Sequence, residues 1–274
     1  MPELPEVEVL RRSLEPHLIG ERIEKVEVRN PSLREPVDVP RLRKAARGRA
    51  VQGLRRRSKY LLIDLEGGWT VVVHLGMSGR LTLAPGEAEP ELHEHVVFTL
   101  ASGRKLRFRD PRRFGLVFAA PTARLEEDPH FAHLGVEPLE PGFSGEVLAL
   151  AAAGRRGPVK AFLMDAGVVV GVGNIYASES LHRAGIHPER SVGRISRGRW
   201  ERLAESAMAV LRQAIVQGGT TLNDFADGEG RSGYFQVSLS VYDREGEPCP
   251  ACGRPVRRIV QSGRSTFYCP GCQR

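Results

Sequence analysis

Four cysteines near the C-terminus have the spacing of a metal site. They form the pairs C-P-A-C at 249–252 and C-P-G-C at 269–272, and the chain has four cysteines in all. The pattern C-x2-C-x16-C-x2-C is typical of zinc bound by four thiolates, whereas two disulfides or a redox pair are the alternative. Four thiolates leave no open position for catalysis. The sequence therefore predicts one structural Zn²⁺ per chain and no catalytic metal, with ligands Cys249, Cys252, Cys269 and Cys272.

The N-terminus begins MPELPEVE, so that Pro2 and Glu3 stand directly behind Met1 and Glu6 follows closely. An ordinary explanation exists, because proline and acidic residues are favoured in the first turn of a helix. Removal of Met1 would instead expose the Pro2 nitrogen as a secondary amine, which is a nucleophile. The pKa of an α-amine is about 8, and a nearby helix N-terminus disfavours its protonated form. A useful fraction would then be neutral and reactive at physiological pH. These residues alone leave both explanations open.

Two further motifs place cations and apolar side chains in turns. RDPRRFG at 109–115 presents Arg112 and Phe114, and HLGMSG at 74–79 carries Met77. A planar guanidinium can reach base edges, and an apolar side chain can wedge between base steps. Phe114 and Met77 are equally compatible with places in a hydrophobic core.

Other features suit phosphate contact and have ordinary explanations as well. GVGNIYASE at 171–179 is a glycine-rich approach to a helix, which favours anion binding but also occurs in tight turns. Lys59 is one of five lysines in an arginine-rich chain, although a surface strand position is the default. A basic segment between the cysteine pairs suits phosphate contact or a solvated hairpin. Its arginines are Arg254, Arg257, Arg258 and Arg264.

Composition favours a cytosolic protein with a polyanionic partner. The chain has 274 residues, a formal net charge of +7 and 41% hydrophobic residues, and its pI is about 9.6. This charge favours nucleic acid as a partner but also fits a merely soluble basic protein. No stretch approaches the ~20 apolar residues of a membrane span, and the N-terminus has no apolar signal region. We therefore expect a cytoplasmic protein without membrane contact.

The elements that must position these residues change character along the chain. An amphipathic helix entered through Pro5 is followed by short strand-like runs separated by turns, which predicts a β-sandwich. Beyond a Pro- and Gly-rich stretch, the pattern becomes helical, and a long glycine-rich loop at 218–236 precedes the cysteine segment. The expected strands are 21–30, 50–57, 60–65, 69–75, 80–83, 95–100, 104–109 and 115–119, and the expected helices after the first are 40–47, 146–153, 173–184 and 197–217.

Taken together, these motifs resemble bacterial formamidopyrimidine-DNA glycosylase, of the family that also contains endonuclease VIII. The matching pieces cover nearly the whole chain in order: PELPEVE, SKYLL, HLGMSG, DPRRFG, GVGNIYASESL and the zinc finger. The endonuclease VIII branch typically begins PEGPE and lacks the DPRRFG loop. Leu4 and the complete loop therefore favour the purine-specific branch.

The resemblance implies a chemical role for the N-terminus. Pro2 would attack C1′ of the damaged nucleoside, displace the oxidised base and form an iminium that permits β- and δ-elimination of the strand. Glu3 would donate a proton during ring opening and base loss, and Glu6 would position the proline or a water. Lys59 matches the residue linked to β-elimination, and Arg264 matches the one linked to δ-elimination.

The resemblance also implies a DNA interface and an architecture. Met77, Arg112 and Phe114 match the residues that fill the gap left by base flipping, with Arg112 pairing to the orphaned cytosine. Other positions that correspond to DNA contacts are His74, His93, Arg155, Lys160, Asn174, Tyr242 and Arg258. The implied fold is α+β and multidomain: an N-terminal helix and β-sandwich at 1–134, a linker at 135–146, a helix–two-turns–helix domain at 147–240 with a lesion loop at 218–236, and a zinc-finger hairpin at 241–274.

The expected partner is double-stranded DNA containing oxidised purines, bound by a monomer acting at the bacterial nucleoid. Two other functions stay open. An endonuclease VIII-like enzyme would prefer oxidised pyrimidines, and a non-enzymatic zinc-ribbon protein would only bind DNA. The second alternative explains the charge and the finger but gives no reason for Pro2, Glu3 and Glu6.

Overall fold

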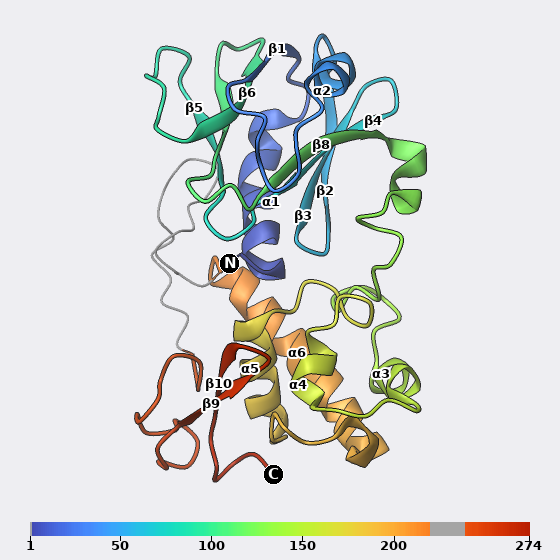
Figure 1. Ribbon diagram of the computed structural model, residues 1–274, viewed down its shortest axis with the longest axis vertical. Coiled ribbons are helices and arrows are strands. Elements are labelled where there is room, and N and C mark those ends of the chain that lie inside the picture. The colour runs from blue at the N-terminus through green and yellow to red at the C-terminus, as the bar shows by residue number, and fades with distance from the viewer. Residues whose placement is uncertain (1, 220–238) are drawn as a thin grey trace. The chain divides into compact units, whose positions relative to one another are not determined.

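The computed structural model describes residues 2–219 and 239–274 (Figure 1). The chain divides into two compact units, the first from the N-terminus to Ala132 and the second comprising His133–Gln217 with the C-terminal segment. Except for Gly218 and Gly219, the predicted lesion loop lies outside the described residues. Among the described residues, no helix is long and apolar enough to cross a membrane. The predicted limits of a linker and a separate finger domain stay a prediction.

The first unit is a sandwich of two four-stranded antiparallel sheets, as predicted. One sheet has the strand order β1-β6-β7-β5 and the other the order β2-β3-β4-β8. Buried apolar side chains, which alternate with exposed ones along some strands and are continuous along others, form one core shared by the two sheets. The strands are β1 (Ile23–Val28), β2 (Val51–Arg57), β3 (Tyr60–Leu65), β4 (Trp69–His74), β5 (Arg80–Ala84), β6 (Glu94–Leu100), β7 (Lys105–Arg109) and β8 (Leu116–Pro121).

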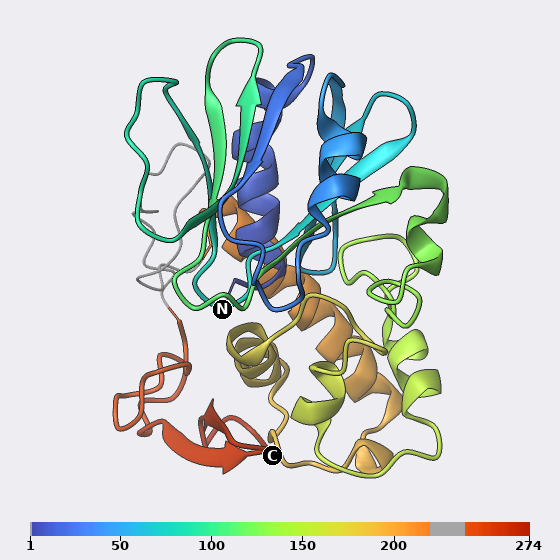
Figure 2. The ribbon, with the colours of Figure 1, turned by 45° about the horizontal axis from the view of Figure 1, so that its top comes forward.

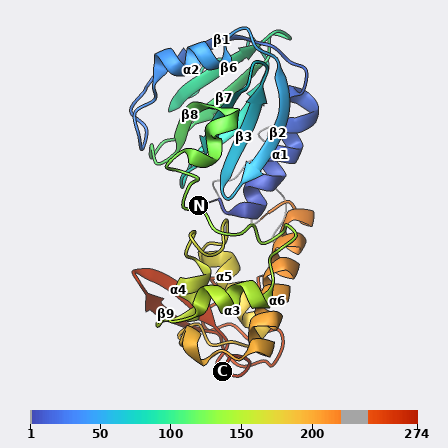
Figure 3. The same ribbon diagram turned by 90° about the vertical axis from the view of Figure 1, so that its right-hand side faces the viewer.

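Two helices accompany the sandwich, α1 (Leu4–Leu18) and α2 (Val39–Ala46). Helix α1 packs on β2 and β3 (Figure 3). It buries one apolar stripe, and each such side chain contributes about 1.5–3 kcal/mol of transfer free energy. The stripe consists of Leu4, Val7, Leu10, Leu14 and Leu18, each at most 1% exposed.

The β2–β3 hairpin runs along α1 in a defined direction. The guanidinium of Arg11 donates to the Leu54 carbonyl at 3.4 Å, and Arg56 lies 3.5 Å from the Glu8 carboxylate. Leu54 therefore lies beside Arg11, and Arg56, which is nearer the hairpin tip, lies beside Glu8, which is nearer the start of the helix. The tip lies at the N-terminal end of α1, as Figure 1 shows.

The second unit is helical and includes the zinc-finger hairpin. Its helices are α3 (Gly145–Ala152), α4 (Val159–Leu163), α5 (Asn174–Ala184) and α6 (Arg197–Val216), and it has a 3₁₀ turn at Val192–Arg194. The first unit has another 3₁₀ turn, at Thr122–Glu127. Strands β9 (Arg257–Gln261) and β10 (Arg264–Tyr268) form the hairpin. Helix α5 packs against both α6 and β10 (Figure 2). The predicted helices are present, and α4 was not predicted because five residues are too few to show a period.

Candidate active site and nucleic-acid interface

The N-terminal residues are held in one conformation by the start of α1. Pro2 is buried, and Glu3 and Glu6 are each 2% exposed. The Glu6 carboxylate accepts a hydrogen bond of 2.8 Å from the backbone N–H of Glu3. It thereby satisfies one of the orphaned donors of the helix start and places negative charge at the positive end of the dipole. Glu6 fixes the backbone that carries Pro2 and Glu3.

Lys59 lies at the tip of the β2–β3 hairpin. The pair Arg57–Tyr60 closes a two-residue turn formed by Ser58 and Lys59. Ser58 adopts a left-handed φ of 56° and is 5% exposed, so the turn is packed in place despite its backbone strain. Because this tip lies at the N-terminal end of α1, the fold brings Lys59 to the same end of the sandwich as Pro2.

Met77 and Phe114 are on the surface rather than in the core. Their exposed fractions are 38% and 44%, which removes the core alternative left open by the sequence. Met77 lies between β4 and β5, and Phe114 lies between β7 and β8. The guanidinium carbon of Arg112 lies 4.8 Å from the centroid of the Phe114 ring, a cation–π contact that orients both side chains.

Asp110 joins the two turns that carry these residues. Its side chain is fully buried and accepts hydrogen bonds from Ser78 Oγ at 2.7 Å and from the Gly115 N–H at 2.8 Å. Its own N–H donates to the carbonyl of His93. His93 is exposed and has a left-handed φ of 67°. A buried carboxylate with this many partners makes the two turns one rigid unit.

Close backbone approach between the same turns requires glycine. A Cβ at Gly76 would lie 2.4 Å from the carbonyl carbon of Phe114, and Gly76 also has a left-handed φ of 64°. A substitution there would separate the segments that carry Met77 and Phe114. Both motifs are visible in the sequence, but the role of Asp110, the one acid in DPRRFG, was not predicted.

His74 is held inside the turn and is 9% exposed. Its Nδ1 accepts a hydrogen bond of 3.0 Å from the Gly76 N–H, and its ring lies 4.9 Å from that of Tyr60. Burial, with the charges of Lys59 and Arg34, lowers the pKa of His74 to about 4. The neutral imidazole therefore supports the turn of Met77, and contact with DNA stays a prediction.

We expect His74 to make the protein less stable in acid. Between pH 6.5 and about 4, the unfolded chain binds a proton on this imidazole that the folded chain does not, so the free energy of unfolding falls as the pH falls. The total loss is roughly 3 kcal/mol. In His74→Asn the amide oxygen can replace Nδ1 as acceptor without titrating. Urea unfolding of both proteins at pH 7 and pH 4.5 should show a smaller pH effect in the variant, and equal effects would contradict the assignment.

In the second unit, Lys160 ties α4, α5 and β10 together. It is 2% exposed, and its ammonium donates to Asn174 Oδ1 at 2.6 Å, Thr266 Oγ1 at 2.8 Å and the Ser265 carbonyl at 3.5 Å. Asn174 donates in turn to the Ser265 carbonyl at 2.9 Å and to the Tyr242 hydroxyl at 3.4 Å. The start of α5 is thereby fixed to the finger hairpin, and a direct Lys160–DNA contact stays a prediction.

Arg264 borders a pocket of about 210 Å³ that is also lined by Lys160, Asn174 and Thr266. It is exposed and follows a two-residue turn in which Ser262 and Gly263 both have positive φ, the type I′ geometry that suits a tight hairpin. The pocket therefore places Arg264 beside Asn174, the first residue of α5, and a cation at such a place favours anions.

The other two predicted arginines differ in their surroundings. Arg258 is exposed and donates to Ser265 Oγ at 3.0 Å. Arg155 forms an ion pair of 2.9 Å with Asp165, and its guanidinium lies 5.6 Å from the Phe162 ring. Its charge is therefore partly balanced within the protein, and its role in DNA binding stays a prediction.

Glu179 anchors the segment that leads into the zinc finger. Its side chain accepts three hydrogen bonds of 2.9 Å from the N–H groups of Ser240, Val241 and Tyr242, and the residue is 7% exposed. The carboxylate thus fixes the backbone of Tyr242, which contacts Asn174. This role was not predicted, although an acid in the apolar motif GVGNIYASE was a usable signal.

We expect Glu179→Ala to destabilise the second unit by about 2–4 kcal/mol, because buried N–H groups lose their acceptor. Glu179→Gln keeps one acceptor oxygen and should cost less. Thermal unfolding of the two variants checks this order. Equal stability of wild type and Glu179→Ala would show that the three hydrogen bonds contribute nothing net.

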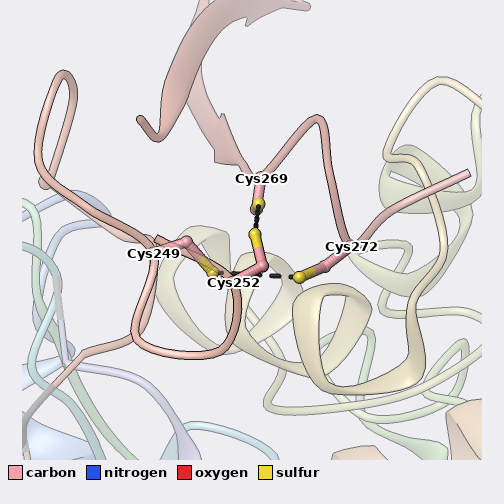
Figure 4. Close-up of side chains that lie close together, drawn as sticks. All are labelled: Cys249, Cys252, Cys269 and Cys272. Atoms are coloured by element: carbon pink, nitrogen blue, oxygen red, sulfur yellow. Dashed lines mark hydrogen bonds between the residues drawn. The ribbon is translucent and has the colours of Figure 1, made fainter. Parts of the chain in front are cut away.

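The four cysteines converge on one point, as Figure 4 shows. Their sulfur atoms all lie within 4.8 Å of one another, with Cys249–Cys272 at 3.9 Å and Cys252–Cys269 at 3.4 Å. A tetrahedral zinc with Zn–S bonds of ~2.3 Å requires sulfur separations of about 3.8 Å. The donor set and its dimensions therefore fit Zn²⁺, as predicted.

The ionisation of the thiols points the same way. The Arg254 N–H and neighbouring thiols lower the pKa of Cys252 to about 7, whereas burial and the neighbouring thiols raise the pKa of Cys272 to about 12. Four sulfurs this close ionise together only around a cation. His182 lies in the last turn of α5, and its Nε2 is 3.4 Å from Cys249 Sγ. A hydrogen bond between His182 and the metal ligand Cys249 therefore connects the cluster to the helices.

Comparison with known proteins covers the whole chain. Residues 1–117 match the formamidopyrimidine-DNA glycosylase N-terminal domain, residues 134–226 its H2TH domain, and residues 246–274 a zinc finger found in FPG and IleRS. A formamidopyrimidine-DNA glycosylase of Xanthomonas campestris pv. campestris is 50% identical over 274 residues, which is all of both chains.

Solved structures agree with this similarity. The MutM (Fpg) protein of Thermus thermophilus is 40% identical with a TM-score of 0.89, covering 99% of this chain and 98% of that one. The Lactococcus lactis Fpg, in complex with DNA containing Fapy-dG, is 32% identical with a TM-score of 0.90, covering 99% and 100%. Similarity of this extent, together with the sandwich, the helical unit and the four-cysteine cluster, shows that the chain belongs to the formamidopyrimidine-DNA glycosylase family.

Proposed function

We propose that this protein is a bifunctional DNA glycosylase and AP lyase of base excision repair, which removes oxidised purines from duplex DNA in the cytoplasm. The observation that carries the proposal is the 50% identity, from end to end, with the Xanthomonas enzyme. A complex of the Lactococcus relative with DNA containing Fapy-dG supports the substrate class. The exposed cations and apolar turns described above suit a nucleic-acid partner.

The proposed reaction begins at Pro2. Its neutral secondary amine attacks C1′ of the damaged nucleoside, the glycosidic bond breaks, and Glu3 supplies a proton during ring opening and base loss. The nitrogen then forms an iminium with the opened sugar, which acidifies the neighbouring C–H bonds and permits two successive eliminations. Burial of Pro2 and the Glu6–Glu3 hydrogen bond support a fixed nucleophile.

Two cations are assigned to the elimination steps. Lys59 serves β-elimination, and its position at the same end of the sandwich as Pro2 supports this role. Arg264 serves δ-elimination, and its exposed place beside a pocket at the start of α5 suits a phosphate leaving group. The zinc holds the finger that carries Arg264, and it takes no part in the chemistry.

The decisive experiment compares cleavage of four duplexes, containing 8-oxoguanine opposite cytosine, thymine glycol, an abasic site, or no damage. The proposal expects fast strand cleavage of the first, with a gap that leaves phosphates on both sides. Preference for thymine glycol would indicate the endonuclease VIII-like specificity. Binding without any cleavage, including on abasic DNA, would indicate the non-enzymatic zinc-ribbon function.

We also propose that Met77, Arg112 and Phe114 fill the gap left by the extruded nucleotide. Their exposure and the Asp110 link between their turns support the assignment. A guanidinium presents donors in a fixed fork and can satisfy the acceptor edge of an orphaned cytosine. An opposing adenine offers a different edge and leaves a buried donor poorly matched.

Arg112→Ala should flatten the preference for cytosine over adenine opposite 8-oxoguanine. A mismatch of this kind costs ~1–3 kcal/mol, or roughly 5- to 150-fold. Phe114→Ala should slow excision of the base but affect cleavage of a pre-formed abasic site less, because no base then needs to be extruded. Arg113→Ala, an exposed neighbour of equal charge, is the matched control. Retention of the full preference in Arg112→Ala would show that this residue does not read the orphaned base.

A further inference from the structure

The loop between β1 and α2 lies beside the turns proposed to enter DNA. Its Arg34 N–H donates to the carbonyl of Gly115 at 3.3 Å, directly after Phe114. The loop is rigid, because Leu33 and Val37 are buried in the sandwich core and the Val37 N–H donates to the Pro31 carbonyl at 2.9 Å. Arg34 is therefore held at the end of the sandwich that carries Phe114.

The Arg34 side chain is exposed and its charge is not balanced locally. Within the described part of the chain, no ion pair of its guanidinium exists. The adjacent acid, Glu35, instead lies 3.2 Å from His130 Nε2. Several other arginines of the first unit are paired, such as Arg29 with Glu94 at 3.0 Å.

Arg34 also belongs to a group of cations with Lys59. Both of their charges contribute to lowering the pKa of His74, which lies at the base of the Met77 turn. Arg34 likewise acts on Tyr60: burial raises the pKa of Tyr60, and the positive charge of Arg34 lowers it. The charge of Arg34 therefore lies near enough to Tyr60 in β3 and His74 in β4 to act on both groups.

We propose that Arg34 binds a backbone phosphate of duplex DNA and is a further positioning contact of the interface. The proposal rests on the proposed function, since it presumes that DNA lies against the Met77 and Phe114 turns. A guanidinium on a rigid loop binds without ordering the backbone and presents a fork that matches phosphate. Such a contact adds affinity without reading sequence.

Salt dependence gives a quantitative test of one phosphate contact. Each contact contributes about 0.9 to the slope of log K against log[salt], which corresponds to about fivefold in affinity at 0.15 M salt. On a duplex carrying a stable tetrahydrofuran abasic analogue, Arg34→Ala should lose this slope and this affinity. Arg34→Lys should keep both, because it keeps the charge. In strand cleavage of 8-oxoguanine DNA, Arg34→Ala should raise KM by about fivefold, whereas Arg34→Lys should keep the KM of the wild type.

Arg41→Ala is the matched control, since Arg41 is also exposed but its guanidinium carbon lies 6.0 Å from the Trp69 ring. Trp69 and His74 are the two ends of β4, which are about 17 Å apart at ~3.3 Å per residue. Arg41→Ala removes the same charge from the chain and should leave the slope as in wild type. An equal change in both variants would overturn a specific contact at Arg34 and indicate a net-charge effect.

A methylphosphonate scan separates direct contact from a field effect. Neutral methylphosphonates are placed one at a time around the analogue, and binding is measured for wild type and Arg34→Ala. One position should weaken wild type about fivefold and leave Arg34→Ala unchanged. If every position affects both proteins equally, Arg34 contacts no phosphate. Failure of the proposed function is distinguishable, because wild type would then neither bind the analogue tightly nor cleave 8-oxoguanine DNA.

Discussion

An N-terminal extension that keeps the Pro2 nitrogen acylated should abolish strand cleavage and borohydride trapping on 8-oxoguanine opposite cytosine. The nitrogen of an internal proline is an amide without a nucleophilic lone pair, so no iminium can form. Removing a catalytic nucleophile costs at least about 10³-fold in rate. Trapping followed by mass spectrometry should locate the adduct on Pro2 in the active protein and find none in the extended one.

The same extension placed at the C-terminus is the control for added length, and it should leave trapping intact. Pro2→Gly with a processed N-terminus should retain reduced trapping, because a primary amine can still form an imine. DNA binding to an uncleavable duplex should change little in all three proteins. Full trapping by the blocked protein, or an intact mass showing Met1 in the active enzyme, would exclude this mechanism.

Replacing Cys249 or Cys272 with Ser should remove the zinc and lower DNA affinity by at least about tenfold, while the sandwich stays folded. Structural zinc contributes about 10–16 kcal/mol of apparent binding free energy to folding in small zinc domains, and the cluster supports the hairpin that carries Arg264. Metal analysis should find about one ion per chain in wild type and far less in either variant. Circular dichroism in the β-sheet region should be nearly unchanged.

His182→Ala is the graded control for this prediction, since it keeps four thiolates but removes the Cys249 partner. Loss of such a partner typically weakens metal binding by about 10- to 100-fold, so His182→Ala should release zinc to a chelator faster than wild type and still contain metal as purified. Less than half an ion per chain in active wild type would contradict the four-thiolate site. Unchanged DNA binding after complete zinc removal would contradict its support of the interface.

Much of the fold follows from short-range patterns that are visible in the chain. The apolar period of α1 and the turns between the strands predicted a helix and a sandwich, and both are confirmed. The helix expected at 173–184 is also confirmed, and Gly185, directly after it, has a left-handed φ of 67°. Such features depend on neighbours within a few residues, and for that reason they can be predicted from sequence.

The candidate site was only partly predictable. Spacing alone predicted the four ligands, because two C-x2-C pairs carry their geometry with them. Whether Met77 and Phe114 face the core or solvent is a tertiary property, since it depends on which surface packs against the turns. The structure exposes both side chains, at 38% and 44%, and no local pattern reports which surface is left uncovered.

The sequence by itself determined the motifs, their order and the chemistry that their side chains permit. Only the tertiary structure decided which residues hold that chemistry in place. Asp110 bonds Ser78, 32 residues away, and Glu179 bonds Ser240, 61 residues away. The backbone N–H of Arg34 donates to the carbonyl of Gly115 from another loop. A carboxylate in a sequence shows its charge but not its partner, because partners this distant are determined by the packing of whole sheets and helices.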